Sequence, residues 1–319
     1  MRSMGEMTIR SFVSGDALRM ADIQKKHVEI SHDASILSPG FFHAPGFENG
    51  RNIICAVDHE GWLVGYAAIC PAHRSGKFGG AHVLWLDLRV DPALVEGDRL
   101  RDTLLEQAAA RAREIKAALS AERVLLSATY FAAGVSSIEY LLSRGFQYYE
   151  STYTMRRNLF DPIPAAPTPE GVEVRSWRME SEAEQRAYLA ASASALRDAA
   201  WKFGELQHFM KSELWSVGTT FTAFAGGEVV GSVMVWYDPN LQWNKERLGF
   251  TERLFVIPPW RKRGIANRLL TEGMRYLRRR GMAQAELQLV SDNRRTVVLY
   301  EALGYYVYKE EVSLGMVLE

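Results

Sequence analysis

The sequence predicts an α/β protein made of two similar units in tandem, each with a central sheet flanked by helices. Apolar strand-like segments alternate with longer helical segments along both halves, which is typical of α/β folds. Gly231, Val256 and Pro258 each lie 166 residues after an identical residue, and this constant offset indicates a duplicated unit. The Pro-rich stretch 161–170 lies between the two copies and is expected to be extended.

The first half begins with a strand, a helix and an antiparallel hairpin. The helix starts near Asp16, a residue type that favours helix N-termini, and the hairpin turns at Glu60-Gly61. The expected elements are strands at 7–12, 52–58, 62–70, 82–90 and 123–128, a helix from 16, helices at 98–119 and 135–144, and closing strands to 158.

The second half repeats this order. Gly226-Gly227 is a strong hairpin signal, and Gly304 ends the last helix. The expected elements are strands at 174–177, 221–225, 228–237, 248–257 and 284–290, helices at 181–198, 203–215, 265–281 and 294–303, and a final pair of strands within 305–318. We therefore expect a first domain at 1–160, a linker at 161–170 and a second domain at 171–319.

Composition indicates a soluble globular protein whose positive and negative charges balance. Lys+Arg and Asp+Glu both number 38, so neither nucleic acid nor an anionic membrane is an expected partner. No run reaches 18 apolar residues, and the first residues lack an apolar signal core. Cys55 and Cys70 form no C-x-x-C pair and are expected to be reduced. We expect a cytoplasmic protein, either a monomer or a homodimer.

The stretch 251–270 carries the clearest chemical signal. It reads as an apolar strand, a Pro-bounded turn, a basic loop and the start of a helix. Such a helix start presents unpaired N–H groups to an anion, and Arg261, Lys262 and Arg263 add positive charge. Gly264 lets the backbone approach a phosphate closely. The sequence contains neither a G-x-x-x-x-G-K-[ST] loop nor a G-x-G-x-x-G loop between a strand and a helix.

The spacing Val256-x-Pro258-x-x-Arg261-x-x-Gly264-x-Ala266 resembles the acyl-CoA loop of the GNAT N-acetyltransferase superfamily. The resemblance covers about 171–319 and implies two tandem GNAT domains, each with a mixed, mostly antiparallel sheet. It also implies acetyl-CoA as the cosubstrate. The implied acetyl-CoA contacts are Arg261, Lys262, Arg263, Gly264, Ile265 and Ala266 at the pyrophosphate, and Leu254, Phe255 and Val256 along the strand near the thioester carbonyl.

Glu252 is the candidate general base. It precedes Val256 by four residues, and strand alternation would place Glu252, Leu254 and Val256 on one face. Burial against apolar neighbours would raise the pKa of this carboxyl, which suits a base. The alternative is an exposed carboxylate paired with Arg247 or Arg253.

Asn293 and Tyr300 complete the implied site. Asn293 matches the residue that contacts the pantetheine arm in the resembled family, and it could equally cap the helix that follows. Tyr300 lies four residues before Gly304, where the family places the acid toward the CoA sulfur; the alternative is a packing tyrosine. The histidines show no H-E-x-x-H or paired ligand spacing, so we expect no metal.

The first half lacks these features under the constant offsets. Glu252 maps to Leu86 and Gly264 to Asp98, while Tyr300 maps to Leu141 with an offset of 159. The corresponding loop is acidic where a pyrophosphate would rest. The first domain is therefore expected to be degenerate and non-catalytic.

The resulting hypothesis is an acetyl-CoA-dependent N-acetyltransferase whose active site lies in the second domain. The acceptor would be a primary amine of a small molecule or peptide, attacking directly in a ternary complex. The two-domain layout is similar to mycothiol synthase, so acetylation of a cysteinyl amine is an alternative. A non-catalytic acyl-CoA sensor is an alternative from another class. The aromatic residues Trp201, Phe203, Phe209 and Trp215 recur at helical spacing, which is typical of a core, but in the resembled family these helices line the acceptor groove.

Overall fold

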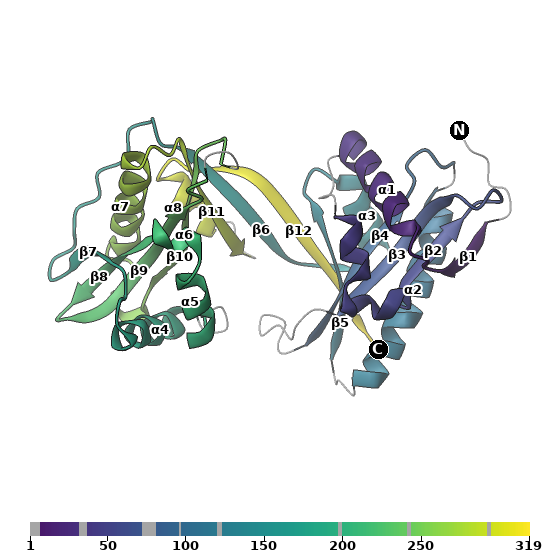
Figure 1. Ribbon diagram of the computed structural model, residues 1–319, viewed down its shortest axis with the longest axis horizontal. Helices are drawn as coiled ribbons and strands as arrows, with labels where there is room; N and C mark the ends of the chain where they lie inside the picture. The colour runs from purple at the N-terminus through teal and green to yellow at the C-terminus, as the bar shows by residue number, and fades with distance from the viewer. Residues whose placement is uncertain are drawn as a thin grey trace. The chain divides into compact units, whose positions relative to one another are not determined.

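The computed structural model describes residues 7–31, 37–71, 81–95, 97–119, 123–196, 200–240, 244–291 and 295–319. The chain divides into two compact units (Figure 1). Unit 1 comprises Met1–Thr152 together with Lys309–Glu319, and unit 2 comprises Tyr153–Tyr308.

Unit 1 has a mixed sheet in the order β1-β2-β3-β4-β5-β12. Neighbouring strands are antiparallel except for β4 and β5, which are parallel. Its elements are β1 (Thr8–Ser11), α1 (Asp16–Ser31), the 3-10 helices η1 (Pro39–His43) and η2 (Pro45–Gly50), β2 (Ile53–Val57), β3 (Leu63–Pro71), β4 (His82–Val90), α2 (Gly97–Leu119), β5 (Val124–Phe131), α3 (Val135–Ser143) and β6 (Gln147–Asn158), whose second half belongs to unit 2.

Unit 2 has the sheet order β6-β11-β10-β9-β8-β7, with β10 and β11 parallel. Its elements are β7 (Glu173–Trp177), α4 (Glu182–Leu196), α5 (Phe203–Met210), α6 (Glu213–Ser216), β8 (Thr219–Ala225), β9 (Glu228–Tyr237), β10 (Leu248–Val256), the 3-10 helix η5 (Pro258–Trp260), α7 (Ile265–Arg279), β11 (Gln284–Ser291), α8 (Arg295–Glu301) and β12 (Tyr306–Leu318). The order of strands and helices in both halves follows the sequence prediction.

Three predicted elements differ from the structure. The closing strands expected to end at 158 are one strand, β6. The helix expected at 203–215 is two helices, because Ser212 has extended backbone angles and begins α6 as its N-cap. The final pair of strands expected within 305–318 is one long strand, β12, and it belongs to both units: Tyr306–Tyr308 lie in unit 2 and the rest in unit 1. The expected second domain, 171–319, therefore extends eleven residues into unit 1.

The Pro-rich stretch 161–170 lies within unit 2 and packs along α7. Arg268 Nη1 donates to the Ala166 carbonyl over 3.0 Å, and Arg157 Nη2 donates to the Pro162 carbonyl over 2.7 Å. Ile163 packs against the core of unit 2. The stretch expected to link two domains is thus an extended segment fixed on one of them.

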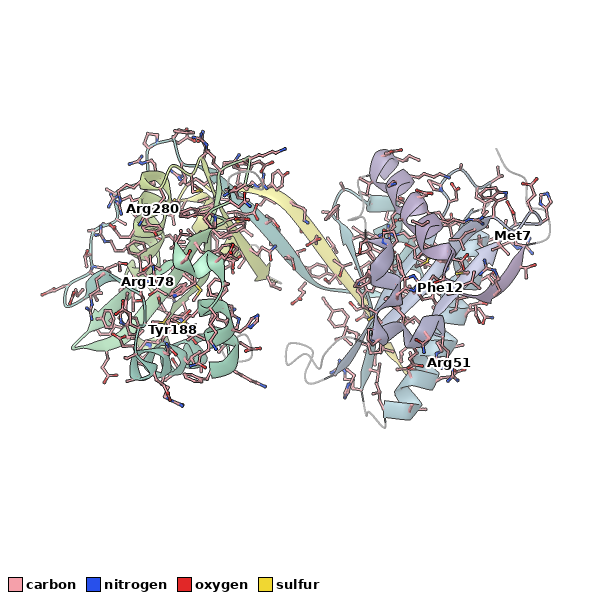
Figure 2. The ribbon with its side chains drawn as sticks, in the orientation of Figure 1. Met7, Phe12, Arg51, Arg178, Tyr188 and Arg280 are labelled. Atoms are coloured by element: carbon pink, nitrogen blue, oxygen red, sulfur yellow. The ribbon has the colours of Figure 1, made fainter. Side chains whose placement is uncertain are left out.

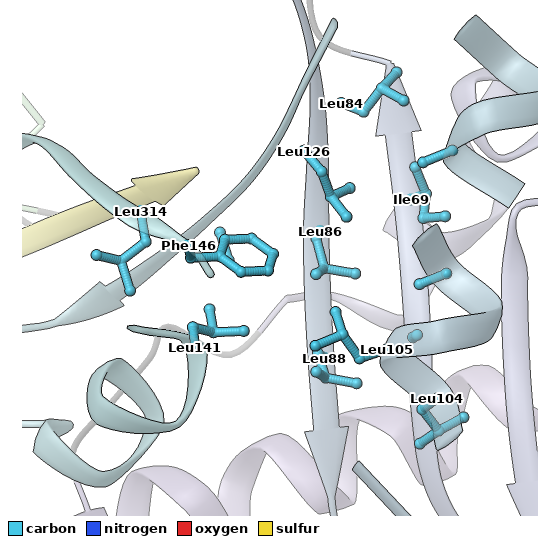
Figure 3. Packing of buried hydrophobic residues seen from close by; sticks show 14 of the residues in the cluster. Ile69, Leu84, Leu86, Leu88, Leu104, Leu105, Leu126, Leu141, Phe146 and Leu314 are labelled. Carbon is cyan, nitrogen blue, oxygen red and sulfur yellow. The ribbon is translucent and has the colours of Figure 1, made fainter. Parts of the chain in front are cut away.

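Each unit buries both faces of its sheet under helices. In unit 1 the α2 face is lined by leucines, and Figure 3 shows Leu88 of β4 close to Leu105 of α2. The opposite face packs on α1 and the two 3-10 helices. In unit 2, α7 and α8 cover one face, and α4, α5 and α6 cover the other. Burial on both faces explains the nearly continuous apolar runs of the inner strands.

Candidate active site

The basic loop of unit 2 has the backbone geometry of an anion-binding helix start. Gly264 caps α7 at φ 82°, in the left-handed region that glycine adopts without a Cβ penalty, and Lys262 has φ 61°. An added Cβ on Gly264 would meet no atom within 4 Å, so open space lies beside it. The first bond of the α7 ladder runs from Arg268 N to Gly264 O, so the N–H groups of the first turn have no partner inside the helix.

Helix α7 is held in place by an apolar stripe. Ile265, Leu269 and Leu270 are fully buried at its start. Gly273 allows close packing on the sheet, because a Cβ there would lie 3.0 Å from Val235. The buried stripe fixes the helix axis, and the axis fixes where the unpaired N–H groups point.

The side chains of the loop have different roles. Arg261, Lys262 and Arg263 are all exposed. Arg261 donates from Nε to the Val256 carbonyl over 3.0 Å and from Nη2 to the Ala195 carbonyl over 3.2 Å. The guanidinium of Arg263 lies 4.7 Å from the ring centre of Trp260. Arg261 therefore fastens the loop to β10 and α4, while the exposed cations of the loop supply local positive charge.

Strands β10 and β11 part next to this loop. Their parallel pairing starts at Leu248–Gln284 and ends at Phe250–Glu286, although β10 continues to Val256. Within the described residues 244–291, the later part of β10 has no ladder partner on the β11 side. The backbone groups of this part of β10 that face β11 lie outside the β10–β11 ladder.

A β-bulge interrupts β10 at the candidate base. The register of β10 on β9 shifts between Glu252, opposite Met234, and Phe255, opposite Ser232. Arg253 sits in the bulge at φ 51°, an uncommon conformation for a side chain other than glycine. One extra residue in the strand reverses the alternation of side chains that follow.

The bulge corrects the predicted orientation of Glu252. Before the bulge, Glu252 shares a face with Met234, which packs with α4, α5 and α6. After it, Phe255 takes that face, while Leu254 and Val256 pack on the α7 side. The prediction that Glu252, Leu254 and Val256 share a face was therefore wrong. It assumed an unbroken period of two residues.

Burial sets the protonation of Glu252. Loss of solvent raises the pKa of this carboxyl above its usual value, and the negative charge of Glu286 raises it further. The neighbouring Arg253 and a hydrogen bond from Trp236 oppose the rise. The net direction is upward, as the sequence predicts.

Aromatic rings surround Glu252 and Arg253 on this face. Trp236 stacks on Phe250, with ring centres 4.1 Å apart, and the Arg253 guanidinium lies 4.0 Å from the ring centre of Trp201. Tyr188, labelled in Figure 2, packs edge-on against Phe255 and interacts with Arg253. The aromatic residues at 201–215 thus contribute to the surroundings of the candidate base as well as to the core.

Tyr300 lies on the other face of the unit 2 sheet. Its side chain is 9% exposed within the α7 cluster, which also includes Leu254 and Val256. Burial raises the pKa of the Tyr300 hydroxyl to about 12, so it stays protonated at neutral pH. The nearby Tyr305 hydroxyl lies 2.9 Å from Thr251 Oγ1 on β10. Asn293 lies outside the described residues.

The bulge also changes how the two units correspond. Upstream of it, Glu252 is paired with Met234, while in unit 1 Asp87 is paired with Ala68. Met234 and Ala68 differ by the same 166 positions that relate the two hairpins. Asp87, rather than Leu86, is therefore the counterpart of Glu252. The sequence comparison missed this carboxylate because it used one offset, 166, for the whole strand. The extra residue of the bulge makes the offset 165 at Glu252.

The other first-half differences agree with the sequence comparison. Asp98 stands in the first turn of α2, where its side chain is mostly exposed. Leu141 is a buried core residue in the place of Tyr300. Unit 1 thus lacks the phosphate loop and the tyrosine but keeps a carboxylate.

Two further observations concern the described residues alone. No group of three or more His, Cys, Asp or Glu side chains is arranged to hold a metal ion. No helix is both long and apolar enough to cross a membrane. A hollow of 660 Å³ beside α4 and the β8–β9 hairpin is lined by neither Glu252 nor Tyr300, so it is separate from the candidate chemistry.

Comparison with known proteins agrees with this geometry. Residues 178–305 match the model of the Acetyltransferase (GNAT) family. The mycothiol acetyltransferase of Streptomyces scabiei (strain 87.22) is 32% identical over 177 residues, which are 53% of this chain and 54% of that protein. The chain thus spans about half the length of the curated relatives that it matches.

Two solved structures match nearly the whole chain. The GCN5-related N-acetyltransferase from Sphaerobacter thermophilus aligns with a TM-score of 0.71 at 21% identity, covering 100% of this chain and 98% of its own. A tandem GNAT protein from the clavulanic acid biosynthesis pathway aligns with a TM-score of 0.59 at 15% identity, covering 98% of this chain and 99% of its own. Residues 178–305 are therefore similar to the GNAT family of acetyltransferases, and the chain as a whole has a tandem GNAT fold.

Proposed function

We propose that this protein is an acetyl-CoA-dependent N-acetyltransferase with its active site in unit 2. The observation that carries the proposal is the parting of β10 and β11 directly before the α7 phosphate loop. This arrangement supplies backbone groups for an acyl-pantetheine arm and unpaired N–H groups for a pyrophosphate. Arg261, Lys262, Arg263, Gly264, Ile265 and Ala266 would form the pyrophosphate site.

The chemistry follows from the two titratable side chains. An acceptor amine attacks the thioester carbonyl, so a C–N bond forms and the C–S bond breaks. The ammonium proton passes to the Glu252 carboxylate, directly or through water, and the Tyr300 hydroxyl supplies a proton to the departing thiolate. Amides of Leu254, Phe255 or Val256 would stabilise the negative charge on the carbonyl oxygen. Solvent then restores both side chains.

The acceptor is a primary amine of a small molecule or peptide in this proposal. The relatives named mycothiol acetyltransferase favour a second candidate, in which the acceptor is the cysteinyl amine of a small thiol. The aromatic face around Glu252 suits an acceptor with apolar surface beside its amine.

The test is release of free CoA from acetyl-CoA, measured by chromatography against a panel of amines. The panel should include simple primary amines, short peptides and compounds with a cysteinyl amine. Acceptor-dependent release, with the acetylated product identified by mass spectrometry, would support the proposal and select between the two acceptor classes. Tight acetyl-CoA binding with no turnover on any acceptor would instead indicate a sensor.

A further inference from the structure

A second opening between parallel strands lies in unit 1. The pairing of β4 with β5 ends at Trp85–Ser127, although β4 continues to Val90 and β5 to Phe131. A cavity of 140 Å³ lies at this opening. It is several times larger than a single water molecule needs. Its polar lining comes from Asp87, Arg89, Thr129 and Glu311.

One wall of the cavity is an Asp87–Arg89 ion pair buried from solvent. Arg89 Nε donates to Asp87 Oδ1 over 2.9 Å, and the two side chains are 5% and 4% exposed. Asp87 Oδ2 accepts two hydrogen bonds, from the Tyr66 hydroxyl over 2.7 Å and from Gln24 Nε2 over 3.1 Å. The Arg89 guanidinium also lies over the ring of Tyr130. These contacts hold the guanidinium in one orientation at the cavity.

Stability alone gives little reason for this arrangement. A buried ion pair costs desolvation that its mutual attraction barely offsets, and apolar residues of similar size are often as stable. The pair nevertheless lies on the α1 face of the sheet, whose core is otherwise mainly apolar and aromatic. Asp87 also occupies the position in unit 1 that corresponds to Glu252 in unit 2. A ligand role for Arg89 accounts for the polar cluster.

The other wall supplies a hydroxyl and a carboxylate. Thr129 Oγ1 lies 3.1 Å from Ser313 Oγ, and Glu311 Oε1 lies 3.2 Å from Lys309 Nζ. The Glu311 side chain is 26% exposed, so it borders both the cavity and solvent. The lining therefore combines a guanidinium, which suits a carboxylate, with a carboxylate, which suits an ammonium group.

The start of α2 is unfavourable for a phosphate group. Asp98 lies in its first turn, where the helix start would otherwise attract an anion. The volume of the cavity itself suits a small ligand.

We propose that unit 1 binds a small zwitterion of amino-acid size at the opening between β4 and β5. Its carboxylate contacts Arg89 and Thr129, and its ammonium group contacts Glu311. Trp85 and Phe131 also line the cavity. This site is separate from the proposed acetyl-transfer site and uses none of its residues.

Isothermal titration calorimetry on the full chain without acetyl-CoA tests the proposal. The probes are the free L-amino acids, with acetate and methylamine as single-charge controls. At least one amino acid should bind saturably, and at least about tenfold more tightly than either control, since both charged walls are then engaged. No saturable binding across the amino acids, or equal binding of methylamine, would overturn it.

Three variants locate the binding. Arg89→Met removes the guanidinium but leaves Asp87 buried without its cation, so this variant can fail to fold. Glu311→Gln and Thr129→Val change partly exposed or neutral groups, and each should weaken binding about tenfold while circular dichroism stays unchanged. Glu106→Gln, at an exposed position on α2, is the matched control. Wild-type affinity in both Glu311→Gln and Thr129→Val would contradict the site. Because the measurement omits acetyl-CoA, it is independent of the proposed transferase activity.

Discussion

The guanidinium of Arg261 donates to the carbonyl oxygen of Val256 over 3.0 Å, and this bond joins the phosphate loop to the last residue of β10. A second bond reaches Ala195 near the end of α4. One side chain thus connects the loop with the opened strand and with a helix of the aromatic face. Its geometry depends on a planar fork of donors that lysine does not possess.

We predict that Arg261→Lys weakens acetyl-CoA binding by about tenfold while changing kcat little. The charge remains, but the two carbonyl bonds that fix the loop are lost. A hydrogen bond to a charged group contributes about 1.5–3 kcal/mol net, and only part of this loss affects acetyl-CoA binding. Steady-state KM for acetyl-CoA measures the effect. Arg263→Lys is the control, because it also keeps the charge but loses only the contact of Arg263 with the Trp260 ring. Equal effects of the two substitutions would contradict a role for the clamp.

A second prediction concerns the glycine that caps α7. Gly264→Asp should abolish measurable acetyl-CoA binding, because a carboxylate would point into the space where the pyrophosphate is expected. Gly226→Asp provides a matched control, since Gly226 also has a positive φ and open surroundings but lies in a hairpin. Both variants should lose about 1 kcal/mol of stability to backbone strain. Only Gly264→Asp should lose binding in equilibrium dialysis.

Glu252→Gln should reduce kcat/KM by about 10²–10⁴-fold, the usual contribution of a general base. In the wild type, activity should fall as pH falls through the raised pKa of Glu252, because only the deprotonated carboxylate accepts a proton. The variant should lack this acidic limb. Glu228→Gln, at an exposed position on β9, should retain it. An unchanged pH–rate profile in Glu252→Gln would remove Glu252 from the mechanism.

The same substitution should raise stability at neutral pH. Because burial raises the pKa of Glu252, the folded state binds this proton more tightly than the unfolded state. The resulting stabilisation is present below the unfolded pKa of about 4.3 and is lost as pH rises through the folded pKa. At pH 7 the wild type therefore bears a desolvated charge that glutamine lacks. Urea midpoints at pH 7 and pH 4 should show a gain at the higher pH that shrinks at the lower one.

Tyr300→Phe should lower kcat by about 10²-fold with little change in KM for acetyl-CoA. Since the pKa of Tyr300 is about 12, its hydroxyl should give no alkaline limb below pH 10. An acetyl thioester of a more acidic thiol should suffer less from the substitution, because that thiolate departs without a proton. Tyr276→Phe, which loses a bond to the Val217 carbonyl, is the control. Equal losses with both thioesters would mean that Tyr300 only packs.

Local patterns in the sequence were sufficient for most of the fold. The Gly226-Gly227 hairpin forms with both glycines at positive φ, and the strand, loop and helix of 251–270 are all present. Each of these depends on neighbouring residues, so periodicity and turn chemistry reveal it. The direction of the Glu252 pKa shift was also predictable, because the strand around it is apolar.

The features that were missed depend on pairing between distant segments. The bulge at Arg253 is visible only in the register of β10 on β9, and it alone determines which face Glu252 occupies. The same extra residue concealed Asp87 as the counterpart of Glu252. The aromatic surroundings of Glu252 likewise come from β9 and from helices far apart in the sequence.

The placement of β12 has a consequence for how the protein is made. Leu314 and Leu318 fill the core of unit 1, and the strand pairs with β5 along Glu311–Leu318. These residues follow the whole of unit 2 in the chain, so they are synthesised after it. Unit 1 must therefore wait with an uncovered β5 edge and an incomplete core until unit 2 has been made, although most of unit 1 is synthesised first.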